Sequence, residues 1–298
     1  MRVAVILNSV SRKKAGFFRY VYPALAQVAT VDVWETRAQG HATALARQAA
    51  EEGFPCVLAA GGDGTLHQVL NGLHSGTQAN LPTLGVIPLG TGNDFARLMN
   101  LQLKKTNWAA RLLAPPQHID IGKIRFGDGL GNTRYFINAC SVGLGPDVVH
   151  RLAGSSRRLG PALTYLLAIL RTFFTNRPQQ VSVITNSMVW SGRLRVGAVA
   201  NGRAFGNQIY IAPEASVTDG KLNVFIAGEF SLTELLKYLL QLKMGKIIRN
   251  ERVYYGTART VGLESIEPLW LEAEGELVCQ LPADISLLAA AQPFLGVV

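Results

Sequence analysis

The chain has 298 residues, of which 48% are apolar and only 16% are charged, and its formal net charge is +9 with a pI near 9.7. This composition excludes an intrinsically disordered chain, and the length predicts about two domains. The positive charge favours anionic partners, namely nucleic acid, phosphorylated small molecules or an anionic membrane surface. The three cysteines show no metal-binding or redox spacing, which favours a reducing cytosol.

The first third of the chain alternates strand-like and helical patterns. Short apolar or β-branched runs occupy 3–7, 31–36, 56–60 and 83–87, and helical patterns at 16–29, 41–52 and 66–73 separate them. This βαβαβαβ order predicts a parallel sheet with helices on its faces, whose ligands bind beyond the carboxyl ends of the strands. Those ends carry small or polar residues, at Asn8, Thr36, 61–65 and 88–93.

The first glycine-rich junction is Gly61-Gly62-Asp63-Gly64-Thr65, which joins a charge-free strand to a helix. Glycines let backbone N–H groups approach a ligand closely, and the N-terminus of a helix favours a phosphate group. Asp63 would repel a phosphate unless a cation or a donor hydroxyl lies between them, and Mg²⁺ is the expected third partner. The alternative is a tight turn in which Asp63 only caps the helix.

A second junction, 88–97, reads Pro-Leu-Gly-Thr-Gly-Asn-Asp-Phe-Ala-Arg. Asn93 or Asp94 would cap the helix that follows. Because one residue is enough for a cap, the presence of both together with Thr91 predicts a ligand site as well.

Two further features precede the second half of the chain. Thr106 is expected to cap a short helix over 107–113. Asp120 lies between apolar neighbours, and the simplest interpretation from the residues alone is a strand residue that faces outward.

From about residue 123 the pattern changes to short alternating runs separated by turn signals. This pattern predicts a mainly β second domain, either a sandwich or a barrel. Two helices, 160–174 and 232–242, interrupt the strands, which are expected at 134–139, 181–185, 193–200, 208–211, 221–227, 253–263, 269–273 and 277–281. The longest apolar stretch, 159–174, is shorter than the roughly 20 residues that span a bilayer.

Charge is uneven in this second half. Residues 151–177 contain five arginines and no acid, and 237–259 contain six lysines or arginines with Glu251 as the one acid. Such clusters suit anionic lipid headgroups, and the alternative is a solvated basic face. Nucleic acid is not an expected partner, because the sequence contains no legible recognition module. Near the end, 272–276 places three glutamates around a glycine, a pattern that a solvated hairpin tip also has.

Together these motifs resemble the soluble diacylglycerol-kinase-like lipid kinases, the bacterial relatives of diacylglycerol and sphingosine kinases, over essentially the full length. The resemblance rests first on the two junctions and on Ile119-Asp120-Ile121-Gly122. The first junction also occurs in NAD kinases, whereas the second indicates the lipid branch. Further matches are Phe136-Ile137-Asn138 with Gly143, Asn201-Gly202, Ala212-Pro213, Asp219-Gly220 and Gly275-Glu276.

The resemblance implies two domains. The first is a three-layer α/β nucleotide-binding domain of the NAD-kinase and diacylglycerol-kinase type, over residues 1–122. The second is a mainly β sandwich that carries the lipid site, over 123–284. Residues from about 285 to 298 would return to pack on the first domain.

The resemblance also implies roles for individual residues. ATP would be held by Asn8, Thr36, Gly61, Gly62, Gly64, Thr65, Thr91 and Asn93. Catalytic Mg²⁺ would be positioned, partly through water, by Asp63, Asp94 and Asp120. Glu276 would be the general base that takes the proton of the lipid hydroxyl, with Asp63 as the second catalytic residue. A second, structural Mg²⁺ or Ca²⁺ would be held, partly by backbone carbonyls, at Ser216, Asp219 and Lys221.

Three positions depart from the family pattern. Ser9 follows Asn8 where the family has proline, which alters the stiffness of that loop. Glu274 stands where the family has aspartate, so the role of the base could be shifted or shared. Asn223 replaces another aspartate and weakens the assignment of the structural metal.

We therefore expect an ATP- and Mg²⁺-dependent lipid kinase that transfers the γ-phosphoryl group of ATP to a hydroxyl of a membrane lipid, such as diacylglycerol or phosphatidylglycerol. Phosphoryl transfer depends on positioning and charge neutralisation, and scattered aspartates suit Mg²⁺. The expected partner is a lipid at an anionic membrane surface, with a homodimer left open, and the expected location is the cytoplasm with peripheral membrane association. The alternatives are an NAD kinase and a non-catalytic protein that binds a nucleotide or a lipid.

Overall fold

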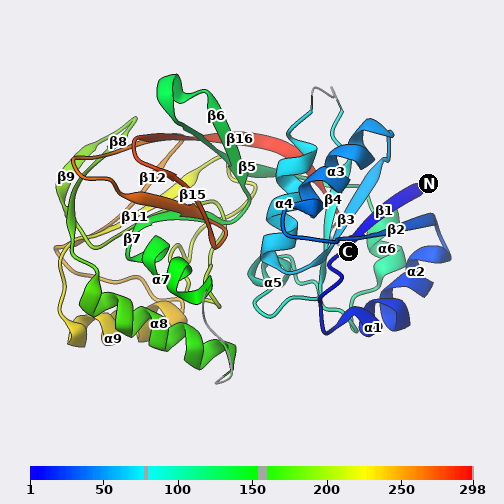
Figure 1. The fold of residues 1–298 in the computed structure, drawn as a ribbon, viewed down its shortest axis with the longest axis horizontal. Coiled ribbons are helices and arrows are strands. Elements are labelled where there is room, and N and C mark those ends of the chain that lie inside the picture. The colour runs from blue at the N-terminus through cyan, green and yellow to red at the C-terminus, as the bar shows by residue number, and fades with distance from the viewer. Residues whose placement is uncertain (77–79, 154–159, 297–298) are drawn as a thin grey trace. The chain divides into compact units, whose positions relative to one another are not determined.

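The computed structural model describes residues 1–76, 80–153 and 160–296. The chain divides into two compact units: unit 1 comprises Met1–Asp120 with the segment from Ala290 onward, and unit 2 comprises Ile121–Ala289. The chain leaves unit 1 within strand β5 (Gln117–Phe126) and returns to it within strand β16 (Ala283–Phe294) (Figure 1).

Unit 1 is built on a parallel sheet. Its strands are β1 (Arg2–Leu7), β2 (Thr30–Glu35), β3 (Cys56–Gly61) and β4 (Thr83–Pro88), in the order β2-β1-β3-β4. The end of β16 continues this sheet, where Phe294 pairs in parallel with Leu84. All of β3 is buried, as expected for a charge-free strand covered on both faces. The α/β fold expected for this part of the chain is confirmed.

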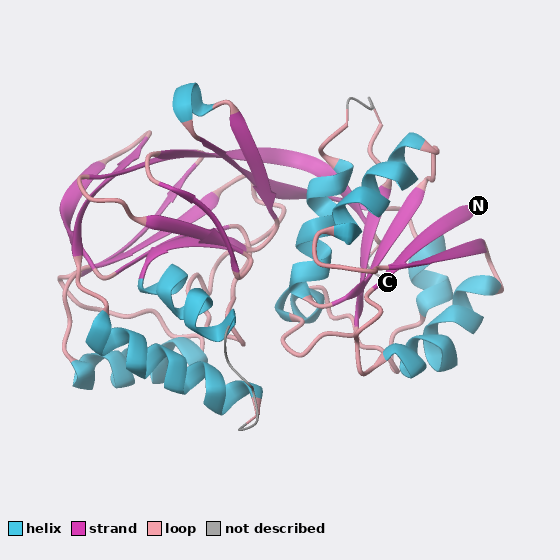
Figure 2. Ribbon diagram, viewed as in Figure 1, coloured by secondary structure: helices cyan, strands magenta, loops and turns pink. Residues whose placement is uncertain are grey.

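Helices connect the parallel strands of unit 1 (Figure 2). Helix α3 (His41–Glu51) and helix α4 (Asp63–Leu73) pack so closely that a β-carbon on Gly72 would lie 2.3 Å from the carbonyl oxygen of Thr43. Two shorter helices follow the sheet strands, α5 (Asp94–Leu98) and α6 (Trp108–Leu113).

The helix expected over 16–29 is not one regular helix. It consists of α1 (Lys14–Gly16), a π-helical segment (Phe17–Val21) and α2 (Tyr22–Ala26). Pro23 lies at the start of α2, where its missing N–H group costs least. The wider π turn just before it lets Tyr22 donate its N–H to the carbonyl of Phe17, five residues back.

The cap of α6 also differs from the expectation. Asn107, not Thr106, is the N-cap residue, and its Oδ1 accepts the N–H of Ala110 at 3.1 Å. The hydroxyl oxygen of Thr106 instead accepts the N–H of Gln102 at 2.7 Å, which closes the preceding turn. Asparagine is preferred over threonine as an N-cap residue, so of these two adjacent candidates Asn107 was the better prediction.

Unit 2 is an antiparallel sandwich of two sheets. One sheet has the order β12-β11-β10-β7-β14-β15, and the other has the order β16-β13-β8-β9 with β5 and β6 attached. Apolar side chains from both sheets form the core between them, including Phe136, Val199 and Leu271. The first sheet contains β7 (Ala139–Gly143), β10 (Val196–Ala200), β11 (Leu222–Ala227), β12 (Val253–Ala258), β14 (Trp270–Ala273) and β15 (Glu276–Gln280). The second contains β6 (Asn132–Phe136), β8 (Gln179–Thr185), β9 (Val189–Leu194) and β13 (Thr260–Ser265).

Three helices of unit 2 share a second core with the first sheet. They are α7 (Leu144–Ala153), α8 (Pro161–Thr175) and α9 (Leu232–Lys243), and Figure 1 shows them grouped together. Val148, Ile169 and Leu235, one from each helix, belong to the same buried cluster as Ala198 and Phe225 of the sheet. Within the described residues, no helix has the length and the apolar composition needed to cross a membrane.

Several expected strands of unit 2 are divided in the structure. The run 193–200 ends in one sheet at Leu194 and continues in the other as β10, and Arg195 is the corner between them. The run 253–263 turns the same kind of corner at Arg259. The run 134–139 is likewise split between β6 and β7, and 208–211 forms only an isolated bridge between Phe205 and Ile209. A hydrophobic run does not reveal such corners, because both halves alternate in the same way.

Candidate active site

The two glycine-rich junctions lie side by side at the carboxyl ends of β3 and β4. The N–H groups of Leu89 and Gly90 both donate to the carbonyl of Gly61, at 2.8 and 3.0 Å. A β-carbon on Gly90 would lie 2.3 Å from the Cα of Gly62, so the two backbones approach too closely for any side chain. This contact requires glycine at position 90, and it is also tight at Gly62, where a β-carbon would lie 3.1 Å from the Cα of Gly90. It brings two loops rich in backbone N–H groups together.

Asn93 fixes the second junction from within. Its Oδ1 accepts the N–H of Gly90 at 2.9 Å and its Nδ2 donates to the carbonyl of Gly90 at 2.8 Å. Asn93 precedes α5 in a left-handed conformation, with φ at 54°, and makes no side-chain cap to that helix. Of the two residues expected to cap this helix, Asn93 or Asp94, Asn93 occupies the N-cap position without a side-chain cap, and its amide instead holds the loop closed against Gly90.

The first junction is also tied to the end of β1. The Nδ2 of Asn8 donates to the Oγ1 of Thr65 at 3.3 Å, and the Oγ1 of Thr36 accepts the N–H of Ser9 at 3.3 Å. The structure thus brings Asn8, Thr36 and Thr65 to one edge of the sheet. Thr91 lies exposed in the loop that follows β4.

Asp63 and Asp94 both approach Gly92. Asp63 is the first residue of α4, and its Oδ1 accepts the N–H of Phe95 at 3.2 Å. The Oδ2 of Asp63 and the Oδ2 of Asp94 lie 3.1 and 4.0 Å from the position that a β-carbon would take on Gly92. Two carboxylates therefore converge beside the glycine loops, each at the start of a helix.

Asp120 occupies a different environment. It is 2% exposed, and its Oδ1 accepts the N–H of Ala290 at 2.7 Å, so the outward-facing interpretation is wrong. Among the described residues, no group of three or more His, Cys, Asp or Glu side chains is close enough to hold a metal ion. The pair formed by Asp63 and Asp94 fits Mg²⁺, which proteins commonly bind through one or two carboxylates with water and phosphate oxygens completing the shell.

Sequence reasoning missed two residues that join the loops at this edge. The Oγ of Ser11 donates to the carbonyl of Leu89 at 2.7 Å, and the Nζ of Lys13 donates to the carbonyl of Gly90 at 2.8 Å. Lys13 thus brings a positive charge to the second junction. The signal available in the sequence was the basic run Arg12-Lys13-Lys14 directly after the first strand end.

In unit 2 the acidic stretch forms a tight hairpin between β14 and β15. Its two turn residues, Glu274 and Gly275, have φ values of 55° and 82°, as a two-residue type I′ turn requires. The Oε1 of Glu274 accepts the backbone N–H groups of Ile137 and Asn138 at 2.9 and 2.5 Å. Glu274 thus anchors the hairpin to the loop before β7.

Glu276 is the first residue after this turn. It forms an ion pair with Arg134, at 3.1 Å between Oε2 and the guanidinium, and its side chain is 26% exposed. A carboxylate that is held by one cation and partly open to solvent can accept a proton from a substrate hydroxyl. The two glutamates of the hairpin therefore differ in their surroundings. Glu274 accepts hydrogen bonds from two backbone N–H groups, whereas the side chain of Glu276 remains partly accessible to solvent.

The third glutamate, Glu272, is buried in the sandwich. Its Oε1 accepts a hydrogen bond from the hydroxyl of Ser141, and its Oε2 accepts the N–H of Gly275 at 3.0 Å. Burial raises the pKa of Glu272 from 4.5 to about 7, and the two hydrogen bonds oppose that rise. The hairpin is therefore not an ordinary solvated tip, because each of its glutamates has a specific partner.

The residues expected to hold a structural metal lie in the loop before β11. The Oδ1 of Asp219 accepts the N–H of Lys221 at 3.1 Å, and the hydroxyl groups of Ser216 and Thr218 are 3.2 Å apart. The carboxylate of Asp219 thus closes its own turn. The structural metal site remains a prediction.

Comparisons with known proteins agree on one family. Residues 2–124 match the diacylglycerol kinase catalytic domain, and residues 140–295 match the YegS C-terminal NAD kinase beta sandwich-like domain. A diacylglycerol kinase of Bacillus subtilis is 30% identical over 253 residues, which cover 84% of this chain and 80% of that protein. A diacylglycerol kinase of Staphylococcus carnosus is 26% identical over 276 residues, covering 92% of this chain and 83% of that protein.

Solved structures show the same fold. The crystal structure of a diacylglycerol kinase from Bacillus anthracis superposes with a TM-score of 0.73 at 20% identity, over 100% of this chain and 98% of that one. The matches span both units, and the relatives are kinases. The chain therefore belongs to the diacylglycerol-kinase-like family of phosphotransferases.

Proposed function

We propose that the protein uses ATP and Mg²⁺ to phosphorylate a hydroxyl group of a membrane lipid. The observation that carries this proposal is the convergence of Asp63 and Asp94 beside Gly92, next to two glycine loops in mutual contact. Backbone N–H groups and a helix N-terminus suit the phosphates of a nucleotide. Diacylglycerol is the first candidate acceptor because curated relatives carry the name diacylglycerol kinase.

The residues of unit 1 would position the nucleotide. Asp63 and Asp94 would hold Mg²⁺, which neutralises phosphate charge when it is bound. The glycine loops would hold the phosphates in a fixed geometry, because Asn93 already binds both the N–H and the carbonyl of Gly90, and Lys13 binds the same carbonyl. Phosphoryl transfer depends mainly on such positioning and on charge stabilisation.

Glu276 would act on the acceptor. Its carboxylate would accept the proton from the lipid hydroxyl as the hydroxyl oxygen attacks the γ-phosphorus and the bond from that phosphorus to the β,γ-bridging oxygen breaks, which releases ADP. Arg134 would keep this carboxylate oriented through the ion pair. Glu274 would keep the turn in place, since its own oxygen is bound by two backbone N–H groups.

The decisive test uses purified protein, γ-labelled ATP, Mg²⁺ and separate lipids: diacylglycerol, phosphatidylglycerol and ceramide. We expect label in one of the lipids, and none when Asp63→Ala replaces the wild-type protein. Formation of NADP from NAD without a labelled lipid would favour an NAD kinase instead. Nucleotide or lipid binding without any phosphorylated product would favour a non-catalytic protein.

A further inference from the structure

Helix α9 is apolar on two opposite faces. One face packs into the core of unit 2 through Leu235, Tyr238 and Leu242. On the opposite face Leu236, Leu240 and Met244 are 48%, 64% and 58% exposed. These three residues follow one another at intervals of four, so they form one continuous stripe along the helix and its C-cap.

Such a stripe is unusual on a surface helix. A helix at the surface of a globular protein normally places charged and polar residues opposite its buried face. A second apolar face is expected where a helix has a further apolar partner. The outer stripe of α9 therefore indicates a surface that is covered during function.

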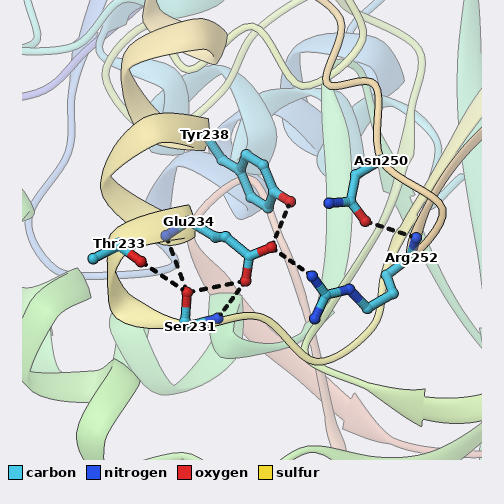
Figure 3. A network of polar contacts seen from close by, with 6 residues as sticks. All are labelled: Ser231, Thr233, Glu234, Tyr238, Asn250 and Arg252. Atoms are coloured by element: carbon cyan, nitrogen blue, oxygen red, sulfur yellow. Dashed lines mark hydrogen bonds and ion pairs between the residues drawn. The ribbon is translucent and has the colours of Figure 1, made fainter.

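The charges around the stripe are positive. Lys237 and Lys243 lie beside it and are exposed, and the ammonium of Lys243 donates to the carbonyl of Asn207 within the same unit. Glu234, the one acid in the sequence of α9, is engaged at the start of the helix (Figure 3). Its Oε1 accepts a hydrogen bond from the guanidinium of Arg252 at 2.5 Å, and its Oε2 accepts one from the backbone N–H of Ser231 at 2.8 Å.

Helix α8 contributes the same combination. Leu163, Leu166 and Phe174 are exposed, and its sequence contains Arg171 and no acid. Aromatic rings connect α8 with α9: Phe173 of α8 stacks on Phe230, and the ring of Phe230 contacts Tyr238 of α9 edge to face. Two further arginines of the predicted basic cluster, at 157 and 158, lie outside the described residues.

We propose that the outer face of α9, with the exposed residues of α8, binds the surface of an anionic lipid bilayer. Helices that lie in a membrane interface combine an apolar stripe with flanking lysines or arginines. Each basic residue near an anionic surface strengthens binding about fivefold, so positive charge selects anionic lipid over neutral lipid. The binding face would keep the protein at the bilayer that contains its lipid substrate. Only this purpose of the binding face rests on the proposed function.

A second copy of the chain fits this face less well. In a two-fold symmetric contact between copies, the same patch meets itself. Lys237 and Lys243 would then approach the same lysines of the other copy, and the +9 net charge of each chain adds to the repulsion. An anionic bilayer instead complements both the apolar stripe and its lysines.

A fluorescent probe on the stripe tests the contact directly. The natural cysteines, Cys56, Cys140 and Cys279, are buried, so a cysteine introduced on the surface can be labelled selectively. Leu240→Cys carrying a nitrobenzoxadiazole group should brighten and shift to the blue with vesicles of phosphatidylcholine and phosphatidylglycerol. It should not respond to pure phosphatidylcholine. The matched control is Ile266→Cys, because Ile266 is 82% exposed and directly follows β13, which belongs to the sheet that α9 does not pack on.

Vesicle sedimentation with unlabelled full-length variants gives the second measurement. Leu240→Glu and Lys237→Glu should each weaken binding to the anionic vesicles by about tenfold or more. The controls, Ile266→Glu and Lys105→Glu, should bind as the wild type does. Circular dichroism melting checks that each variant is folded.

Activity on a dispersed short-chain diacylglycerol separates this inference from the proposed function. Leu240→Glu should keep wild-type activity on that substrate and lose activity on vesicles. Vesicle binding without activity on any lipid would contradict the proposed function but would still support the membrane-binding face. If the fluorescence of the probe at position 240 does not change with anionic vesicles, the membrane-binding face is wrong. It is also wrong if Leu240→Glu changes the oligomeric state but not vesicle binding.

Discussion

The Oδ1 of Asp63 accepts the backbone N–H of Phe95, 32 residues further along the chain, at 3.2 Å. One carboxylate oxygen thus joins the first residue of α4 to the first turn of α5. The other oxygen, Oδ2, lies on the side of Gly92, where Asp94 also points. The two oxygens of Asp63 therefore have separate tasks, one in the fold and one in the proposed chemistry, and two substitutions can separate them.

Asp63→Asn should fold normally and lose activity. The amide keeps an oxygen for the N–H of Phe95 but removes the negative charge proposed to hold Mg²⁺. We expect kcat to fall about 100-fold or more, while the free energy of unfolding changes by no more than about 0.5 kcal/mol. Asp63→Ala also leaves the N–H of Phe95 without its acceptor, so it should be less stable than the asparagine variant by about 1–2 kcal/mol. Urea denaturation and turnover of labelled ATP measure the two effects.

The control for Asp63 is Asp128→Asn, which removes an exposed carboxylate from a short turn of unit 2. It should retain wild-type stability and turnover. Retention of full activity by Asp63→Asn would show that this charge has no part in the reaction.

Gly90→Ala should weaken nucleotide binding. The added methyl group would lie 2.3 Å from the Cα of Gly62, so the two junctions must separate. Overpacking of this kind costs about 1–3 kcal/mol. It lowers the free energy of unfolding and also shifts the backbone of the two loops. Titration with a fluorescent ATP analogue should show a raised Kd. Gly131→Ala is the matched control, because a β-carbon at Gly131 meets no heavy atom within 4 Å; equal affinities for the two variants would contradict this account.

The glycine loops could be predicted from the sequence because their signals are local. Strand, glycines and helix follow one another within a few residues at Gly61–Thr65, and the order of such units defines a parallel sheet. The hydrogen bonds from the side chain of Asn93 to the backbone of Gly90 could not be predicted in the same way. Its left-handed conformation and the approach of Gly90 depend on how two loops meet, and a cap was the simpler local interpretation.

The burial of Asp120 and Glu272 depends on partners far away in sequence. Asp120 is bonded to Ala290, which lies 170 residues further on, and Glu272 to Ser141, which precedes it by 131. In β14 the register shifts between Leu271 and Glu272, and both residues are buried. A bulge breaks the alternation on which strand predictions depend, so the pattern alone placed this glutamate at a solvated hairpin.

Glu276→Gln should abolish most of the activity without preventing substrate binding. Glutamine can still accept a hydrogen bond from Arg134 but cannot take a proton from the lipid hydroxyl. Removing a general base lowers kcat by about 10²–10⁴-fold. Steady-state kinetics should show this fall in kcat, with the Kd for the ATP analogue unchanged. Glu264→Gln, at an exposed position on β13, is the control and should behave as the wild type; a normal kcat for Glu276→Gln would require another base.

Glu272 should make the stability of the protein depend on pH. The pKa of this carboxyl group is about 7 in the folded protein, against 4.5 as its ordinary value, because burial disfavours the charged form. Between these two values the folded state binds more protons than the unfolded state does. The resulting stability is fully present below about pH 4.5 and is lost as the pH rises to about 7, by an amount on the order of 3 kcal/mol. Cys140, Glu274 and Cys279 are the titratable neighbours that share this environment.

Glu272→Gln should remove this pH dependence. The amide imitates the protonated acid, because its oxygen can accept the N–H of Gly275 while its nitrogen donates to the hydroxyl of Ser141. Urea denaturation between pH 5 and pH 8 should show the wild type losing stability relative to the variant as the pH rises. Parallel stability curves for the two proteins would mean that Glu272 is already ionised throughout, with its charge stabilised by Ser141 and the backbone.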